Sequence, residues 1–119
     1  MTNDASSGDR EILIAAYREF NARRIDAVLA LMHSDVVWPN GMEGGYVHGH
    51  DGVRAYWTRQ WGILEPHVDP LKIELDRQGR IVVEVHQVVR DLSGKLLFDT
   101  IVHHTYTIRA GLIERMEIE

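Results

Sequence analysis

Apolar residues recur at intervals of three and four through the first half of the chain, which is typical of amphipathic helices. This pattern predicts three helices, over residues 11–24, 25–33 and 52–64. Ser7 or Asp9 is the expected N-cap of the first helix, Asp51 is that of the third, and Pro66 is the expected stop. The apolar stripes of the first and third helices contain Leu13, Ala16, Tyr17, Phe20, Val53, Trp57, Trp61 and Leu64.

Alternation of apolar and polar residues dominates the second half of the chain and is typical of half-buried strands. It predicts four long strands, over residues 67–76, 80–91, 95–109 and 112–119. Two short strands, over residues 35–38 and 45–49, precede them. Short turns join the long strands, so we expect an antiparallel meander. Because the apolar faces of strands and helices must cover each other, the sequence predicts a two-layer α+β fold.

The same alternation divides the strand residues between two faces of the sheet. The face covered by helices is expected to hold Leu71, Ile73, Leu75, Val85, Gln87, Phe98, Val102, His104, Tyr106, Leu112, Met116 and Ile118. The outer face is expected to hold Val82, Val88, Ile101 and His103. This outer face is more apolar than an exposed sheet face of a monomer should be, which predicts a homodimer.

Composition narrows the classes of function. The 119 residues, 45% of them apolar, fit one domain over residues 9–119 after a flexible tail of residues 1–8. A net charge of −5 without a basic stripe argues against nucleic acid as a partner. Without cysteine there is no disulfide and no thiol catalysis. No apolar run reaches the roughly 18–20 residues that span a membrane, and no signal peptide is evident, so we expect a cytoplasmic protein.

Four segments resemble, in their order and spacing, the nuclear transport factor 2-like superfamily, which includes ketosteroid isomerase and the SnoaL-like polyketide cyclases. They are AYREFNARRIDAVLALM at 16–32, DVVW at 35–38, GHDGVRAYW at 49–57 and GLIERME at 111–117. The resemblance implies a cone, in which a curved, mixed sheet of about six strands wraps around three N-terminal helices. It also implies a deep apolar pocket and dimerisation through the outer face of the sheet.

The resemblance to ketosteroid isomerase places that enzyme's catalytic positions on this chain. Its carboxylate base falls on Asn40, whose amide cannot accept a proton at neutral pH. Its helical tyrosine falls nearest Ala16, with Tyr17 one residue along, and its oxyanion aspartate falls on His103 or His104. We therefore do not expect steroid isomerase chemistry, and Asn40 is instead expected to help place a carbonyl or hydroxyl group.

His104 and Tyr106 are the leading catalytic candidates. Neighbouring strand residues point to opposite faces, so alternation selects His104 for the pocket and His103 for the outer face. His104 could serve as a proton shuttle or hydrogen-bond donor, or it could be a buried histidine satisfied by a neighbour. The Tyr106 hydroxyl could bind a ligand carbonyl, orient His104 or belong to the core. Gln87 could bind His104, a ligand or water.

An aromatic wall and several other side chains are expected to line the pocket. The predicted ligand-binding residues are Tyr17, Phe20, Trp38, Trp57, Trp61, Gln87, His48, Val85, Val102 and Met116. Aromatic stripes at helical spacing usually belong to a core, but five large rings around a cone suit an apolar ligand.

The segment His48-Gly49-His50 has a spacing that some metal sites use. The pattern indicates no further ligand, and Gly49 is expected to end the strand and separate the two rings. The alternative is a pair of loop histidines, one of them at the pocket entrance. We therefore expect no metal and no other cofactor.

The expected function is a SnoaL-like domain that binds a small hydrophobic organic molecule. If it is an enzyme, it would catalyse cofactor-free proton transfer on a carbonyl or hydroxyl compound, as an isomerase, cyclase or dehydratase. The alternative is a non-catalytic ligand-binding or accessory dimeric module. A third hypothesis is a purely structural dimerisation domain, which predicts a cone filled by its own side chains.

Overall fold

The computed structural model describes residues 7–119, so residues 1–6 of the expected tail lie outside the described part of the chain. Ser7 and Gly8, which were expected in the tail, and Asp9 already belong to the first helix. The elements in chain order are α1 (Ser7–Asn21), α2 (Ile25–Leu29), β1 (Met32–Pro39), β2 (Tyr46–His48), α3 (Gly49–Trp61), β3 (Leu64–Leu75), β4 (Ile81–Asp91), β5 (Leu96–Arg109) and β6 (Leu112–Ile118).

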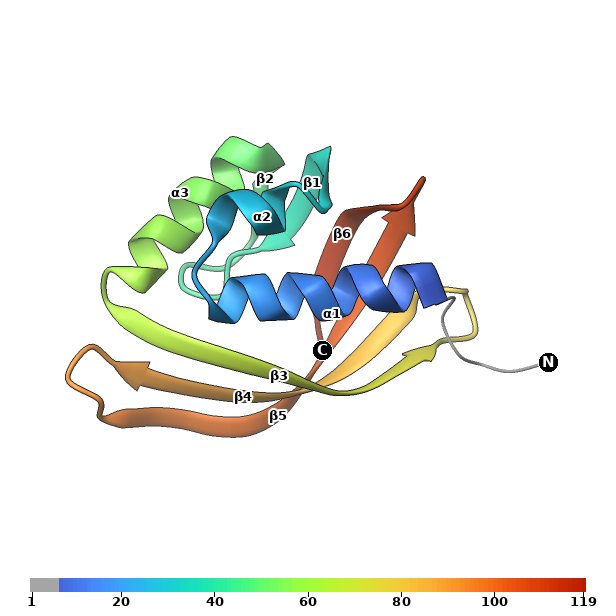
Figure 1. The fold of residues 1–119 in the computed structure, drawn as a ribbon. Coiled ribbons are helices and arrows are strands. Elements are labelled where there is room, and N and C mark those ends of the chain that lie inside the picture. The colour runs from blue at the N-terminus through green and yellow to red at the C-terminus, as the bar shows by residue number, and fades with distance from the viewer. Residues whose placement is uncertain (1–6) are drawn as a thin grey trace.

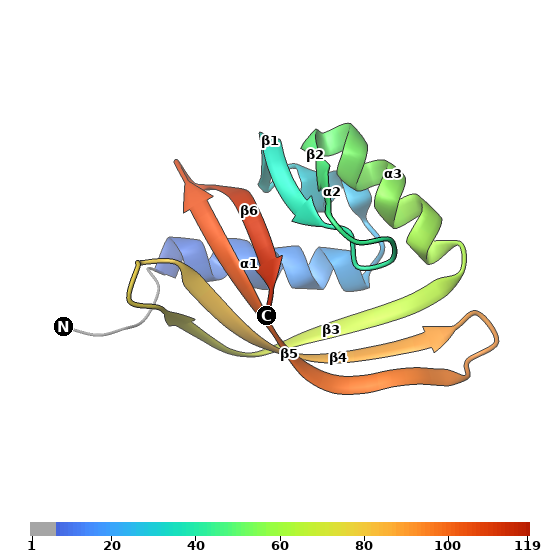
Figure 2. The ribbon, with the colours of Figure 1, turned by 180° about the vertical axis from the view of Figure 1, so that it is seen from behind.

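The six strands form one curved sheet in the order β2-β1-β6-β5-β4-β3. β1 runs parallel to β6, and the other neighbouring strands are antiparallel. α1 lies across the concave side of the long strands, and α2 and α3 lie beside β1 and β2 at one end (Figures 1 and 2). The α+β class, the mixed curved sheet and the three helices predicted from the sequence are confirmed.

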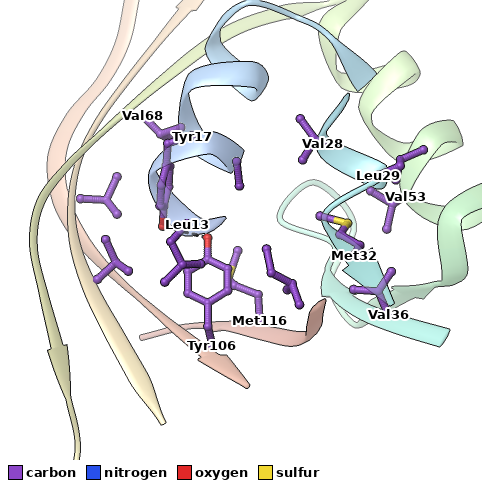
Figure 3. Packing of buried hydrophobic residues seen from close by; sticks show 14 of the residues in the cluster. Leu13, Tyr17, Val28, Leu29, Met32, Val36, Val53, Val68, Tyr106 and Met116 are labelled. Atoms are coloured by element: carbon purple, nitrogen blue, oxygen red, sulfur yellow. Dashed lines mark hydrogen bonds between the residues drawn. The ribbon is translucent and has the colours of Figure 1, made fainter. Parts of the chain in front are cut away.

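The hydrophobic core fills the space between the helices and the concave side of the sheet. Figure 3 shows Leu13, Tyr17, Tyr106 and Met116 where α1 meets the sheet, and Val28, Val36 and Val53 between α2, β1 and α3. Burying one large apolar side chain contributes about 1.5–3 kcal/mol to stability. Among residues 7–119, no helix has the length and apolar character needed to cross a bilayer.

The second helix is shorter than predicted. α2 ends at Leu29, and Met32, which was expected in this helix, begins β1. Met32 pairs with Ile113 of β6, and the Ile113 N–H donates to the carbonyl of Leu31 at 2.9 Å. A strand from the far end of the chain therefore overrides the local helical pattern.

The third helix begins and ends earlier than predicted. Gly49 has φ 71°, a left-handed conformation that glycine adopts without strain, and it makes the corner between β2 and α3. Asp51 consequently lies in the first turn of α3 instead of capping it. Pro66 lies within β3, opposite Val89, where an edge strand tolerates a missing N–H.

Two irregularities change which side chains enter the core. Between β3 and β4 the pairing passes from Pro70 to Lys72, so Leu71 is an extra residue. Leu71 is therefore 55% exposed, although it was predicted on the inner face with Ile73. A shift between β5 and β6 likewise buries Ile113 completely and leaves Leu112 only partly buried, against the prediction. A bulge adds one residue to one strand and reverses the facing of the residues beyond it.

Candidate functional site

A cavity of about 440 Å³ lies between the helices and the concave side of the sheet. Residues of α3 and the loop after β1 line it on one side, and residues of β3, β4 and β5 line it on the other. It is lined by Ala16, Tyr17, Phe20, Val28, Trp38, Pro39, Gly41, Met42, Tyr56, Trp57, Gln60, Leu64, Pro66, Val68, Gln87, Val89, Phe98, His104, Tyr106, Met116 and Ile118. A cavity beside Trp38 and His104 counts against a purely structural domain with a filled cone.

The lining is apolar and uncharged. Within the described part of the chain it contains no Asp, Glu, Lys or Arg. Its polar side chains are Tyr17, Tyr56, Gln60, Gln87, His104 and Tyr106. The cavity therefore suits a neutral organic molecule with a few polar groups, because a buried charge would find no partner of opposite sign there.

A chain of three buried polar side chains lies at the inner end of the cavity. Tyr106 donates its hydroxyl hydrogen to the Tyr17 oxygen at 2.8 Å, and the Tyr17 hydroxyl lies 2.8 Å from Nδ1 of His104. Figure 3 shows the two tyrosine hydroxyls pointing toward each other. His104 and Tyr106 are two residues apart on β5, so both point to the inner face, where α1 presents Tyr17.

Burial keeps these three hydrogen-bonded side chains uncharged at physiological pH. Desolvation, with a smaller repulsion from the neighbouring His103, lowers the pKa of His104 from 6.5 to about 4. Desolvation, together with the neighbouring Tyr106, raises the pKa of Tyr17 well above its usual value, and burial also raises the pKa of Tyr106. His104 is therefore an uncharged imidazole, and both tyrosines keep their hydrogens.

With Tyr106 as the donor to Tyr17, the hydrogen bonds favour one tautomer of His104. Because Tyr17 accepts from Tyr106, its own hydrogen is free to point to Nδ1 of His104. A neutral imidazole carries one hydrogen, which must then lie on Nε2. Nε2 has no hydrogen-bond partner among residues 7–119, and His104 lines the cavity. The series of hydrogen bonds from Tyr106 through Tyr17 therefore ends at the Nε2–H of His104, a donor that is available to a bound molecule.

The aromatic wall is centred on Trp57, which is 1% exposed. Its ring packs edge-to-face against Phe20 and Trp38, with centroids 5.2 and 5.5 Å away. These three rings and Tyr17 line the cavity, as expected. Trp61 instead stacks on Trp57 at 5.7 Å and does not line the cavity.

Four other residues expected at the site also lie outside the cavity lining. The Asn40 side-chain oxygen accepts from the N–H groups of Met42 and Glu43 at 3.1 and 2.9 Å, so it stabilises its own turn. His48 is exposed at the end of β2. Val85 is completely buried, and its cross-strand neighbour Val102 packs partly buried against the core.

The two histidines of the H-G-H segment are held apart. His48 ends β2, whereas His50 lies in α3, with Nε2 3.0 Å from the carbonyl oxygen of Met32. Within the described residues no three His, Asp or Glu side chains come together as a metal site would need.

Gln87 lines the cavity as expected but does not contact His104. His104 pairs across the strands with Val83, four residues away from Gln87 along β4. The Gln87 amide has no hydrogen-bond partner among the described residues, and it faces the cavity. The sequence suggested His104, a ligand or water as the partner of Gln87, and of these a ligand or water remains.

Sequence reasoning missed Tyr56 and Gln60 on α3. The Tyr56 oxygen accepts from the N–H of Gly41 at 3.0 Å and from Nε2 of Gln60 at 3.2 Å. Residues four apart on a helix share a face, which was the signal available in the sequence. The prediction from the sequence rested instead on the apolar stripe through Val53, Trp57 and Trp61, which lies next to this pair on the helix.

Comparisons with known proteins agree with this architecture. Residues 13–116 match the model of the SnoaL-like domain family. The structure of TerC co-crystallised with polyporic acid is 30% identical, with 95% of this chain and 91% of that chain covered and a TM-score of 0.82. An NTF2-like protein of unknown function from Burkholderia pseudomallei K96243 is 26% identical, with 96% and 91% covered and a TM-score of 0.82.

More distant structures share the fold. A proposed polyketide cyclase from Pseudomonas putida KT2440 is 19% identical, with 97% of this chain and 92% of that chain covered and a TM-score of 0.80. A search of curated proteins gave no match.

Proposed function

This chain belongs to the SnoaL-like domain family, and from that premise we propose that it binds a small, hydrophobic, uncharged organic molecule through a carbonyl or hydroxyl oxygen. The observation that carries the proposal is Nε2 of His104, which has no hydrogen-bond partner within residues 7–119 and belongs to a residue that lines an uncharged, aromatic-lined cavity. A buried donor is stabilised when it finds an acceptor. The relative co-crystallised with polyporic acid supports a small organic ligand.

Tyr17 and Tyr106 act in this proposal as positioning residues. Their hydrogen bonds favour the tautomer of His104 that presents Nε2–H, and burial keeps the imidazole uncharged at neutral pH. Hydrogen bonds in an apolar environment are stronger electrostatically than hydrogen bonds in water. The donor would thus orient the ligand and draw electron density toward its oxygen.

A second candidate function is cofactor-free proton transfer on the bound molecule, of the isomerase, cyclase or dehydratase type. The same donor favours it, because a preorganised N–H stabilises negative charge that develops on an oxygen. The described lining offers no carboxylate base, however, and a His104 pKa of about 4 makes the imidazole a weak base. Ligand binding is therefore the function that the geometry supports best.

Binding of two compounds that differ only in a hydroxyl group tests the proposal. 2-Naphthol and naphthalene would be titrated against the protein by calorimetry and by quenching of the cavity tryptophans Trp38 and Trp57. We expect His104→Phe to weaken 2-naphthol binding by about five- to tenfold, because one hydrogen bond is lost. Naphthalene, which has no oxygen, should bind both proteins similarly. The exposed neighbour His103→Phe is the matched control.

Equal binding of 2-naphthol to the wild type and to His104→Phe would contradict the proposed donor.

Turnover is tested separately, with ketone and hydroxyketone substrates followed by absorbance between about pH 5 and 9, the range in which histidine normally titrates. Loss of turnover in His104→Phe with binding retained would establish the enzymatic function over the non-catalytic one.

We also propose that the protein forms a homodimer through the outer face of the sheet. Ile101 is 47% exposed there, and Val82 and Val88 on the neighbouring strand are only partly buried. Exposed apolar groups on a sheet face are stabilised when a second surface covers them.

A further inference from the structure

We propose that the cavity contains a second polar subsite, formed by Gln60 and Tyr56 of α3 and Gln87 of β4. This inference rests on the proposed function, in which His104 binds one oxygen of the ligand. The second subsite would bind a hydroxyl group at the other end. The ligand class is then a rigid, mostly apolar molecule with an oxygen at each end.

The first element of the subsite is the amide of Gln60. Its Nε2 donates to the Tyr56 hydroxyl at 3.2 Å, while its Oε1 is buried and has no hydrogen-bond partner within residues 7–119. Gln60 lines the cavity. A buried amide oxygen without a donor is unfavourable, and a ligand hydroxyl that donates to it would relieve this.

The second element is the hydroxyl of Tyr56, which is 3% exposed. Its oxygen accepts from both Gly41 and Gln60, so both lone pairs are occupied and its hydrogen is left to donate. If the Gln60 amide were turned over, Tyr56 would donate to its oxygen, and the amide NH₂ would lack a partner instead. Either orientation leaves one polar group on α3 unsatisfied at the cavity wall.

The third element is Gln87, whose amide lies on the sheet side of the cavity, whereas Gln60 lies on the helix side. No side-chain hydrogen bond of Gln87 is formed among the described residues. Gln87 pairs with Thr100, four residues along the strand from the pairing of Val83 with His104. Four strand residues span about 13 Å, so Gln87 and His104 are at different depths of the cavity.

The rest of the described lining is mostly apolar. Phe20, Trp57, Val68 and Met116 belong to it, and none of these side chains offers an oxygen or a free amide. A ligand with one polar end would leave either His104 or the glutamines without a partner. A ligand with a hydroxyl near the glutamines and a carbonyl or hydroxyl at His104 would satisfy both.

Three biphenyls that differ only in their hydroxyl groups test the inference. Biphenyl, 4-phenylphenol and 4,4′-dihydroxybiphenyl would be titrated by calorimetry against the wild type, Gln60→Leu, Gln87→Leu and His104→Phe. The exposed Gln78→Leu, in the turn between β3 and β4, is the matched control. Gln87→Leu replaces an amide that has no partner among the described residues, and Gln60→Leu loses one hydrogen bond to Tyr56, so both glutamine variants should fold. Thermal melts verify this.

We expect the wild type to bind the diphenol about tenfold more tightly than the monophenol, which corresponds to one further hydrogen-bonded group. Gln60→Leu and Gln87→Leu should each reduce this preference to about threefold or less, whereas Gln78→Leu should retain it. His104→Phe should weaken both phenols. A diphenol preference that both glutamine variants retain would overturn the second subsite while leaving the role of His104 intact. If His104→Phe weakened neither phenol, the proposed function itself would be overturned.

Discussion

At the scale of single residues, His103 and His104 show how position alone separates two identical side chains. His104 is 6% exposed and hydrogen-bonded to Tyr17, whereas His103 is exposed on the outer face and lies 3.8 Å from Glu84. Strand alternation was enough to assign the two faces from the sequence. It could not show that the partner of His104 would be Tyr17, 87 residues away.

The buried imidazole predicts a specific dependence of stability on pH. The pKa of His104 is about 4 in the folded protein, against 6.5 in the unfolded chain. Between these values only the unfolded state binds the additional proton, so the free energy of unfolding falls as the pH is lowered from about 6.5 to about 4. The loss is up to about 1.4 kcal/mol per pH unit and about 3 kcal/mol in total.

Urea unfolding at a series of pH values measures this dependence. We expect His104→Gln to flatten the acid limb relative to the wild type, and His103→Gln to retain most of it. The difference between the two variants separates His104 from the carboxylates that titrate in the same range. Parallel acid limbs for the wild type and His104→Gln would show that His104 is not buried in its neutral form.

Tyr17 is the centre of the hydrogen-bond chain, and Tyr17→Phe removes two bonds at once. Tyr106 then has no acceptor, and Nδ1 of His104 has no donor. We expect a loss of about 1–3 kcal/mol of stability, because two buried polar groups lose their partners. Nitrogen NMR should show His104 changing from the Nε2–H tautomer to a mixture. The exposed Tyr46→Phe, which loses only a contact with Glu117, should cost about 0.5 kcal/mol or less.

Asn40 illustrates the limit of transferring a role between relatives. The resemblance placed a catalytic base there, but the side chain caps its own turn through Met42 and Glu43. The local sequence Pro39-Asn40-Gly41 already contained this alternative, since asparagine often bonds to the backbone two residues on. Local turn chemistry was the better guide at this position.

At the scale of elements, α1 is attached to the edge of the sheet by its last residue. The Asn21 amide donates to the carbonyl of Val68 at 2.8 Å and accepts from the Val68 N–H at 3.0 Å. β3 is an edge strand, so within residues 7–119 these backbone groups have no strand partner on that side. Asn21 therefore occupies the place of a neighbouring strand and fixes α1 above the cavity.

Substituting Asn21 tests this attachment. We expect Asn21→Ala to cost about 1–3 kcal/mol, because two bonds to partly buried backbone groups are lost. Asn21→Asp keeps an acceptor for the Val68 N–H but turns a carboxylate oxygen toward the Val68 carbonyl, so it should also destabilise the protein while protecting the Val68 N–H. Chemical unfolding gives the stabilities, and amide hydrogen exchange at Val68 should rise most in the alanine variant. Unchanged exchange at Val68 in Asn21→Ala would contradict the proposed role.

The sequence predicted every helix and strand but misplaced some of their boundaries and faces. Leu71 and Leu112 were assigned to the core because alternation was extended through the whole strand. The bulges that exclude them depend on the pairing with β4 and β5, which no local pattern records. Met32 moved from helix to strand for the same reason, since its partner Ile113 lies 81 positions further along the chain.

At the scale of the whole molecule, the architecture followed from the need of the apolar faces to cover each other. The cavity did not follow in the same way. Its uncharged lining depends on which side chains fill the space. Val85 and Gln87 lie on the same face of β4, yet Val85 is completely buried and Gln87 lines the cavity, a difference that alternation does not predict. Packing in three dimensions therefore decides which residues contact a ligand.

The outer face of the sheet carries the last prediction. Ile101 is 47% exposed, and it pairs across the strands with His86, whose Nε2 lies 2.6 Å from Asp99. An apolar centre with polar pairs around it is typical of protein interfaces. A stable interface buries at least about 1,000 Å² in total, which the broad face of β4 and β5 could supply. We expect the wild type to sediment as a dimer at micromolar concentration.

Ile101→Glu should convert this dimer to a monomer, because each subunit would bury a carboxylate without a partner of opposite charge in the interface. Leu92→Glu, a matched change at a similarly exposed residue in the turn after β4, should leave the dimer intact. Since His104 lies on the opposite face of β5, the monomeric variant should still bind 2-naphthol with unchanged affinity. A wild-type monomer at tens of micromolar, or an Ile101→Glu variant that still sediments as a dimer, would exclude this face as the interface.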